Sequence, residues 1–169
     1  MIALNSPELF GLLVSPAEIE EAKKRDKINA AHHEAGHAVV AILLGSTLVR
    51  ANITPTHTKQ PWGERHWIGS CTRRSDARDK LHLIGIAGVI AEAILSNEWH
   101  ENFGDSLDLS EISESDAEHL TEGNVDEASF RAYHILHWHW DFVIRIAQAL
   151  IEEESLTDWQ IIQLRDMKP

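Results

Sequence analysis

The chain of 169 residues contains a single cysteine, Cys71. One thiol cannot form an internal disulfide, and without a second cysteine the chain cannot build a structural zinc site from thiolates alone. We expect Cys71 to be a small, half-buried apolar side chain. Long apolar runs are absent too, because the longest, Ala38 to Leu44, is far shorter than the roughly 20 residues that span a bilayer. The sequence therefore predicts no transmembrane segment.

Positive charge is scarce. There are 15 Lys and Arg against 27 Asp and Glu, which gives a formal net charge of -12. Nucleic-acid backbones attract clusters of Lys and Arg, and this chain has only Lys23-Lys24-Arg25 and Arg73-Arg74, so we expect no nucleic-acid partner. The first residues lack a basic start followed by a sustained apolar stretch, so we expect no secretory signal and a cytoplasmic location. The sequence also contains no P-loop, and hence no P-loop ATPase.

The run His33-Glu34-Ala35-Gly36-His37 has the form H-E-x-x-H. Residues four apart in an α-helix lie on the same face, so the imidazoles of His33 and His37 can converge on one ion, and Glu34 borders the same site. Zn²⁺ accepts neutral imidazole in tetrahedral geometry, and a catalytic zinc site has three protein ligands and one water. The motif therefore predicts two zinc ligands and a general base, with a third ligand elsewhere in the chain.

The surrounding residues favour a helix at the motif. Residues 28–44 are rich in helix formers, contain no proline and end before Gly45, a natural C-terminal stop. Gly36 costs such a helix roughly 1 kcal/mol relative to alanine, which is understandable if another element packs closely on that face. The alternative is a buried helix with incidental histidines, although both imidazoles would then need partners along an otherwise apolar face.

The whole pattern predicts one mainly α-helical domain, residues 1–169, with a small antiparallel β-sheet. Its 43% hydrophobic residues are enough for one core. We expect an N-terminal helical extension, residues 1–27, and a core, residues 28–165. The extension would hold two helices, one opened by Ser6-Pro7 and one by the capping pattern Ser15-Pro16 with Glu18, which would continue into the motif helix. The other predicted elements are strands at 47–54 and 66–72 joined by a loop at 55–65, helices at 76–95, 116–122, 125–154 and 158–166, and a loop at 96–112.

Four carboxylates are candidates for the third zinc ligand: Glu92, Asp105, Asp108 and Asp116. An oxygen donor is expected when two histidines come from one helix. Glu92 lies on the predicted helix at 76–95, whose small residues would let it pack closely on the motif helix, so geometry favours Glu92. Asp116 lies where a loop enters a helix, and it is equally suited to be an N-cap carboxylate.

Four segments, taken in order along the chain, carry a family resemblance. They are Ala31-His-His-Glu-Ala-Gly-His-Ala38, Asn52-Ile-Thr-Pro55, Ala87-Gly-Val-Ile-Ala-Glu92 and Ala149-Leu-Ile-Glu-Glu-Glu-Ser-Leu-Thr157. Together they resemble the peptidase domain of the FtsH-type ATP-dependent zinc peptidases, over roughly residues 28–165. One difference is His32, which stands where that family usually has tyrosine.

The resemblance bears on the third ligand. In that family the ligand is the Asp of a Ser-Asn-Asp segment at the start of a later helix, and Ser115-Asp116 is the best counterpart in this sequence. The resemblance therefore implies that Asp116 is the third ligand and that Glu92 is a supporting residue on the packed helix. Asp108 stays a rival, because the segment between Glu92 and Asp116 is longer than in the family.

The resemblance also implies a fold and an activity: a zincin-like metallopeptidase that hydrolyses peptide bonds with Zn²⁺, a metal-activated water and Glu34 as base and then acid. The family's ATPase module and membrane anchors are missing, so we expect peptides or unfolded proteins as substrates, including chains delivered by a separate ATPase partner. An extended substrate would add to a strand edge of the hairpin at 47–72. The alternative is a catalytically inactive metal-binding or regulatory protein that keeps the fold.

Residues 133–141 form a second group rich in histidine and tryptophan. His134 and His137 are three apart, which invites a second metal site. On a helix, however, His139 points away from that pair, and the two tryptophans fall on different faces. We interpret the segment as a helix contacted on several sides or as an interface helix, and a homo-oligomer is a reasonable expectation.

Overall fold

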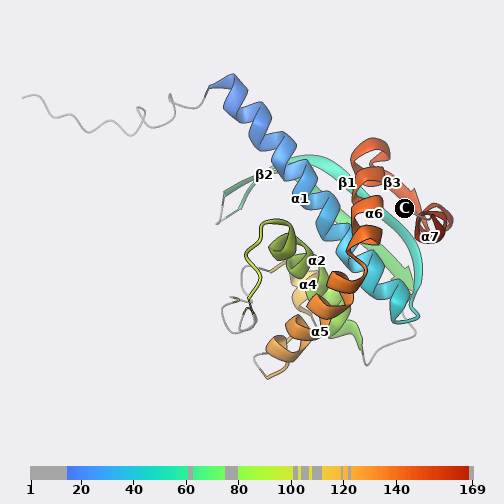
Figure 1. Ribbon diagram of the computed structural model, residues 1–169. Coiled ribbons are helices and arrows are strands. Elements are labelled where there is room, and N and C mark those ends of the chain that lie inside the picture. The colour runs from blue at the N-terminus through green and yellow to red at the C-terminus, as the bar shows by residue number, and fades with distance from the viewer. Residues whose placement is uncertain are drawn as a thin grey trace, which may run out of the picture.

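The computed structural model describes residues 15–60, 63–74, 80–100, 112–118, 120–121 and 123–167, together with Phe103 and Leu107. In this part of the chain six helices accompany one three-stranded antiparallel sheet (Figure 1). The predicted mainly helical architecture with a small antiparallel sheet is thereby confirmed. No helix within the described ranges is long and apolar enough to cross a membrane. The predicted helix at Ser6-Pro7 and the candidate ligands Asp105 and Asp108 lie outside the described residues.

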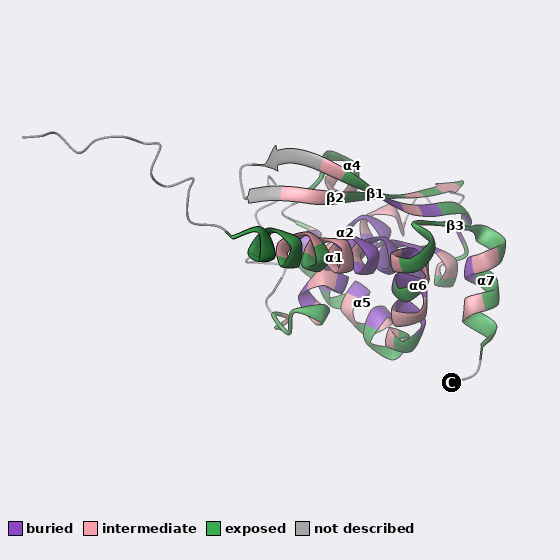
Figure 2. Cartoon of the chain, turned by 90° about the horizontal axis from the view of Figure 1, so that it is seen from above, coloured by how far each residue is buried: buried purple, intermediate pink, exposed green. Residues whose placement is uncertain are grey.

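Helix α1, Pro16–Leu43, carries the H-E-x-x-H motif. It begins at the predicted capping box, in which the Ser15 side chain accepts a hydrogen bond from the Glu18 backbone and the Glu18 carboxylate accepts one from the Ser15 backbone. The helix continues into the motif, as predicted, and Gly45 follows it with a φ of +82°. Its first turns extend beyond the rest of the molecule, whereas the motif region is buried (Figure 2).

The sheet consists of β1 (Thr47–Gln60), β2 (Gly63–Arg74) and β3 (Ser155–Thr157), in the order β2-β1-β3. The hairpin formed by β1 and β2 confirms the predicted pair of strands, but the predicted loop at 55–65 is wrong. Pairing continues to Gln60 and Gly63, and a register irregularity between Pro55 and Thr58 accommodates the proline. The sequence did not predict β3, because three residues are too few to show a strand period.

The remaining helices are α2 (Leu81–Leu95), α4 (Glu114–Ala117), α5 (Val125–Trp138), α6 (Trp140–Glu153) and α7 (Asp158–Asp166). The predicted single helix at 125–154 is wrong, because the chain leaves the helical conformation at His139. Packing explains the break: α5 contacts α2 and α6 contacts α1, so each half follows a different neighbour. The helix predicted at 116–122 corresponds to α4, which starts two residues earlier and is shorter than predicted. The last helix and its Thr157 cap are confirmed.

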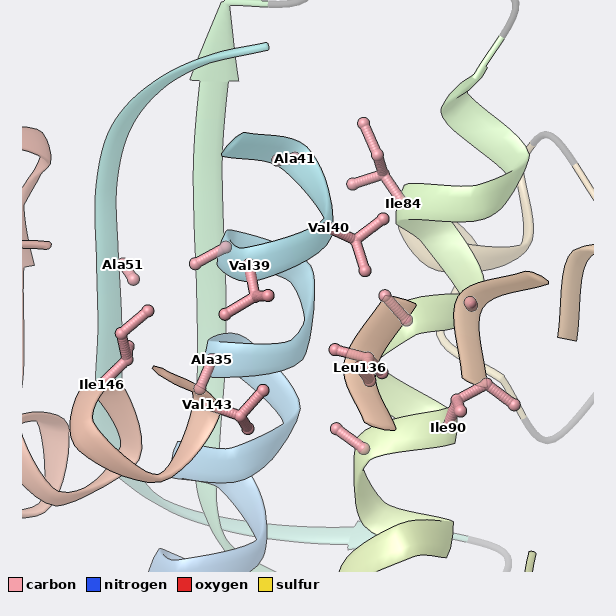
Figure 3. Packing of buried hydrophobic residues seen from close by; sticks show 14 of the residues in the cluster. Ala35, Val39, Val40, Ala41, Ala51, Ile84, Ile90, Leu136, Val143 and Ile146 are labelled. Atoms are coloured by element: carbon pink, nitrogen blue, oxygen red, sulfur yellow. The ribbon is translucent and has the colours of Figure 1, made fainter. Parts of the chain in front are cut away.

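The core surrounds α1. The hairpin covers one side of this helix, and α2 and α6 pack against its other sides (Figure 1). In Figure 3, Val39 of α1 lies toward Ala51 of β1 and Ile146 of α6, while the neighbouring Val40 lies toward Ile84 of α2; all five side chains are fully buried. Because α1 is held on several sides, the motif residues that it carries have a fixed position.

Gly36 confirms that α1 and α2 approach closely. A Cβ atom added to Gly36 would lie 2.6 Å from the carbonyl oxygen of Ala87 and 2.7 Å from the Cβ of Ala91. Both atoms belong to the packed helix α2 and cannot give way easily. The glycine inside the motif therefore permits the contact that brings α2, with Glu92, next to the two histidines.

Candidate metal centre

Three side chains from two helices converge in the structure: His33 and His37 of α1, and Asp116 of α4. The Nε2 atoms of the two histidines are 3.0 Å apart. Asp116 places Oδ2 3.2 Å from His33 Nε2 and Oδ1 3.3 Å from His37 Nε2. These separations are close to the spacing of about 3.3 Å expected between ligand atoms around tetrahedral zinc. The three residues could therefore hold a metal ion.

The Nδ1 atoms of His33 and His37 make hydrogen bonds away from the site, and these bonds determine whether the inward-facing Nε2 atoms have a free lone pair. His37 Nδ1 lies 2.6 Å from the carbonyl oxygen of Ile84, which can only accept, so Nδ1 carries the proton and Nε2 of the neutral ring has the lone pair. His33 Nδ1 makes the corresponding hydrogen bond to Glu92 Oε1, at 2.7 Å. With both rings neutral, the two imidazoles and the Asp116 carboxylate would direct lone pairs at one another. This donor set suits a cation.

The carboxylates also favour a proton on His33. Burial disfavours the imidazolium, but hydrogen bonds to Asp116 and Glu92 outweigh burial and raise the pKa of His33 well above its usual value. Burial likewise opposes ionisation of the carboxyl groups of Asp116 and Glu92. Hydrogen bonds from the histidines nevertheless lower the pKa of Asp116, and the hydrogen bond from His33 lowers the pKa of Glu92. A metal ion would therefore replace a proton at this site.

Zinc binding is expected to release about one proton per chain at neutral pH, because the imidazolium of His33 must lose its proton before Nε2 can bind a metal. Since the raised pKa of His33 favours the imidazolium, zinc affinity should rise with pH, by up to about tenfold per pH unit below that pKa. Isothermal titration of zinc into metal-free protein, in buffers of different ionisation enthalpy, measures the protons released. Zero proton release and a pH-independent affinity between pH 6 and 8 would contradict this prediction.

Glu34 lies beside this group and is only 4% exposed. Its Oε2 atom is buried and has no hydrogen-bond partner within the described part of the chain. Burial raises the pKa of Glu34 against the opposing charges of the two histidines. A buried carboxylate oxygen without a partner is costly, and the raised pKa means that Glu34 takes up a proton more readily than an exposed glutamate does.

Asp116 owes its position to residues that sequence reasoning missed. Ser113 is the N-cap of α4, and its hydroxyl donates a hydrogen bond to Asp116 Oδ2 at 2.7 Å while accepting one from the Asp116 backbone. The N-cap role considered for Asp116 therefore belongs to Ser113. On the side of α2, Gly85 leaves room for the Asp116 backbone, where a Cβ would overlap with its carbonyl oxygen. The Ser-x-x-Asp spacing of a capping pattern was the available signal.

The other candidate residues occupy different places. Glu92 contacts the outer nitrogen of His33, not the side that faces His37, so it supports a ring and does not join the three converging donors.

Cys71 has a raised pKa, because burial and the nearby Glu34 disfavour its thiolate. His134 and His137 belong to no group of three potential ligands among the described residues. They contact aromatic rings instead, Phe130 and Tyr133 respectively.

No protein-family model matches the chain, and no curated protein matches it either. A function for this protein must therefore be inferred from the geometry of His33, Glu34, His37 and Asp116 and from the residues that hold them.

Proposed function

We propose that this protein is a zinc-dependent metalloendopeptidase with a zincin-like fold, related to the FtsH peptidase domain. The observation that carries the proposal is the position of Glu34. Its buried side chain, whose Oε2 has no hydrogen-bond partner among the described residues, lies beside two imidazoles and a carboxylate that converge on one point. A merely structural metal site would not need such a base.

His33, His37 and Asp116 would hold the zinc, and two imidazoles with one carboxylate are a donor set used by catalytic zinc sites. When bound there, zinc lowers the pKa of a coordinated water toward neutrality and polarises the scissile carbonyl. Glu92 and the Ile84 carbonyl oxygen keep the two rings in orientation through their Nδ1 atoms.

Glu34 moves the proton in this proposal. Its free Oε2 accepts the proton of the attacking water, and the same oxygen then donates it to the nitrogen of the departing amine. Burial makes the carboxylate a stronger base than an exposed glutamate, because its pKa is raised. One residue thus serves both proton transfers.

The free edge of β2 supports an extended peptide as the substrate. Among the described strands β2 pairs only with β1, and its residue Gly69 lies directly against Glu34. The Asp26 carboxylate already accepts hydrogen bonds from the backbone N–H groups of His66 and Trp67. The remaining part of the strand, Ile68–Arg74, is where a substrate backbone would pair. Pairing of this kind requires an unfolded or flexible chain.

The proposal is tested by cleavage of a permanently unfolded protein, such as reduced and alkylated casein carrying a quenched fluorophore. We expect fluorescence to rise with the zinc-loaded protein, to stop after chelation and to return when zinc is restored. A tightly folded protein is the matched control and should stay intact, because the assay contains no ATP to drive unfolding. Tight zinc binding by a pure sample without any cleavage would contradict the proposal and would identify a metal-binding or regulatory protein.

A further inference from the structure

Gly69 occupies an unusual place in β2. A Cβ atom at this position would overlap with the Cγ, Cδ and Oε1 atoms of Glu34. Backbone conformation does not require the glycine, because among the described glycines only Gly45 has a positive φ. A glycine inside a strand costs stability, since it has no side chain to pack and more freedom in the unfolded chain. Something other than the strand itself must therefore account for it.

Alternation along β2 explains why the contact is unavoidable. Trp67 and Cys71, two residues before and after Gly69, are partly buried and pack against the core. Ile68 and Ser70, its direct neighbours, are exposed, and so is Gly69 itself, which has only its backbone. Since side chains alternate across a strand, any side chain at position 69 would point inward, into the space of the Glu34 carboxylate.

Glu34 has little room to retreat from such a side chain. Its helix, α1, is packed against α2 and α6 on its other sides. Its neighbours in the sequence, His33 and Ala35, are engaged as well: His33 binds Glu92 and Asp116, and Ala35 is fully buried. A side chain at position 69 would therefore force the Glu34 carboxylate out of its position beside His33 and His37, at a cost in packing.

We propose that Gly69 is a positioning residue for the general base: the missing side chain admits the Glu34 carboxylate between α1 and β2 and holds it beside His33 and His37. The role of Glu34 as base rests on the proposed function, whereas the contact between Gly69 and Glu34 does not. The two can thus be tested separately.

The contact is tested by a thermal double-mutant cycle on full-length, metal-free protein. Gly69→Ala should lower Tm by about 3–6 °C with Glu34 present, because the added Cβ would overlap with the buried Glu34 side chain. The same loss should occur with Glu34→Gln, which keeps the shape of the side chain. With Glu34→Ala the obstacle is gone, and Gly69→Ala should leave Tm unchanged or raise it. An equal loss of Tm in all three backgrounds would overturn the inference.

Two further variants frame the result. Gly123→Ala is the matched control, because among the described residues a Cβ there would meet nothing closer than Thr121 Oγ1 at 3.9 Å, and the Tm and turnover of this variant should stay at the wild-type values. Gly88→Ala should instead disturb a proposed zinc ligand, because a Cβ there would overlap with the His33 ring. This variant should therefore weaken zinc binding. If Gly69→Ala alone fails to fold, recovery of soluble protein by adding Glu34→Ala supports the contact, and continued failure overturns it.

Turnover then reports on the positioning role. Gly69→Ala should bind one zinc per chain with wild-type affinity, lower kcat at least tenfold and change KM less than about threefold. A wild-type kcat in a variant that shows the thermal coupling to Glu34 would overturn the role. If the wild-type protein itself has no peptidase activity, the proposed function fails, while the thermal cycle still decides the contact.

Discussion

Replacing Glu34 with glutamine is expected to lower kcat for an unfolded substrate by about a thousandfold and to leave zinc content unchanged. The amide has nearly the size of the carboxylate, so the packing between α1 and β2 should persist. It cannot accept the proton of the attacking water, however, whereas Glu34 lies beside the proposed metal ligands and its Oε2 has no hydrogen-bond partner among the described residues. Turnover of the fluorogenic substrate and zinc per chain are measured on the same preparation.

The matched control is Glu127→Gln, which makes the same chemical change on an exposed turn of α5. It should have wild-type turnover and zinc content. If Glu34→Gln keeps more than about a tenth of the wild-type kcat at equal zinc content, Glu34 is not the general base, because general-base catalysis typically contributes a factor of 10² to 10⁴.

Replacing Asp116 with alanine is expected to weaken zinc binding more than about a hundredfold and to abolish turnover at micromolar zinc. Even the loss of an outer partner of a ligating histidine usually costs about 10–100-fold in metal affinity, and Asp116 faces both Nε2 atoms directly. Competition against a chromophoric chelator measures the affinity.

Two substitutions distinguish Asp116 from the other candidate ligands. Glu92→Gln should weaken zinc binding by about 10–100-fold, because Glu92 contacts the outer nitrogen of His33 and not the metal side. Asp108→Asn should have no effect. Wild-type affinity in Asp116→Ala, combined with loss of binding in Asp108→Asn, would assign the third ligand to Asp108 instead.

The features that the sequence predicted well are those determined by local chemistry. The capping boxes at Ser15 and Thr157 mark where α1 and α7 begin, because each needs only a hydroxyl and a residue three positions later. The spacing of His33 and His37 places both rings on one face of any helix, whatever the rest of the fold. The close approach at Gly36 was predictable too, because a glycine inside a helix needs a reason.

The features that it missed depend on contacts between distant segments. No proline or glycine marks the break at His139, which follows from the different partners of α5 and α6. The strand β3 exists because it pairs with β1. Asp116 is 83 positions from His33, and only the resemblance to a family, not spacing, distinguished it from Glu92. The contact between Gly69 and Glu34 likewise joins a strand to a helix, and no sequence pattern reveals it.

The central claim is that His33, His37 and Asp116 bind one zinc ion next to Glu34. The most direct test is a crystal structure of the zinc-loaded protein with diffraction data collected on both sides of the zinc absorption edge. We predict one anomalous peak per chain, about 2.0–2.2 Å from His33 Nε2, His37 Nε2 and an Asp116 oxygen. A zinc peak elsewhere, or density at this position that excludes Asp116 from the coordination, would contradict the claim.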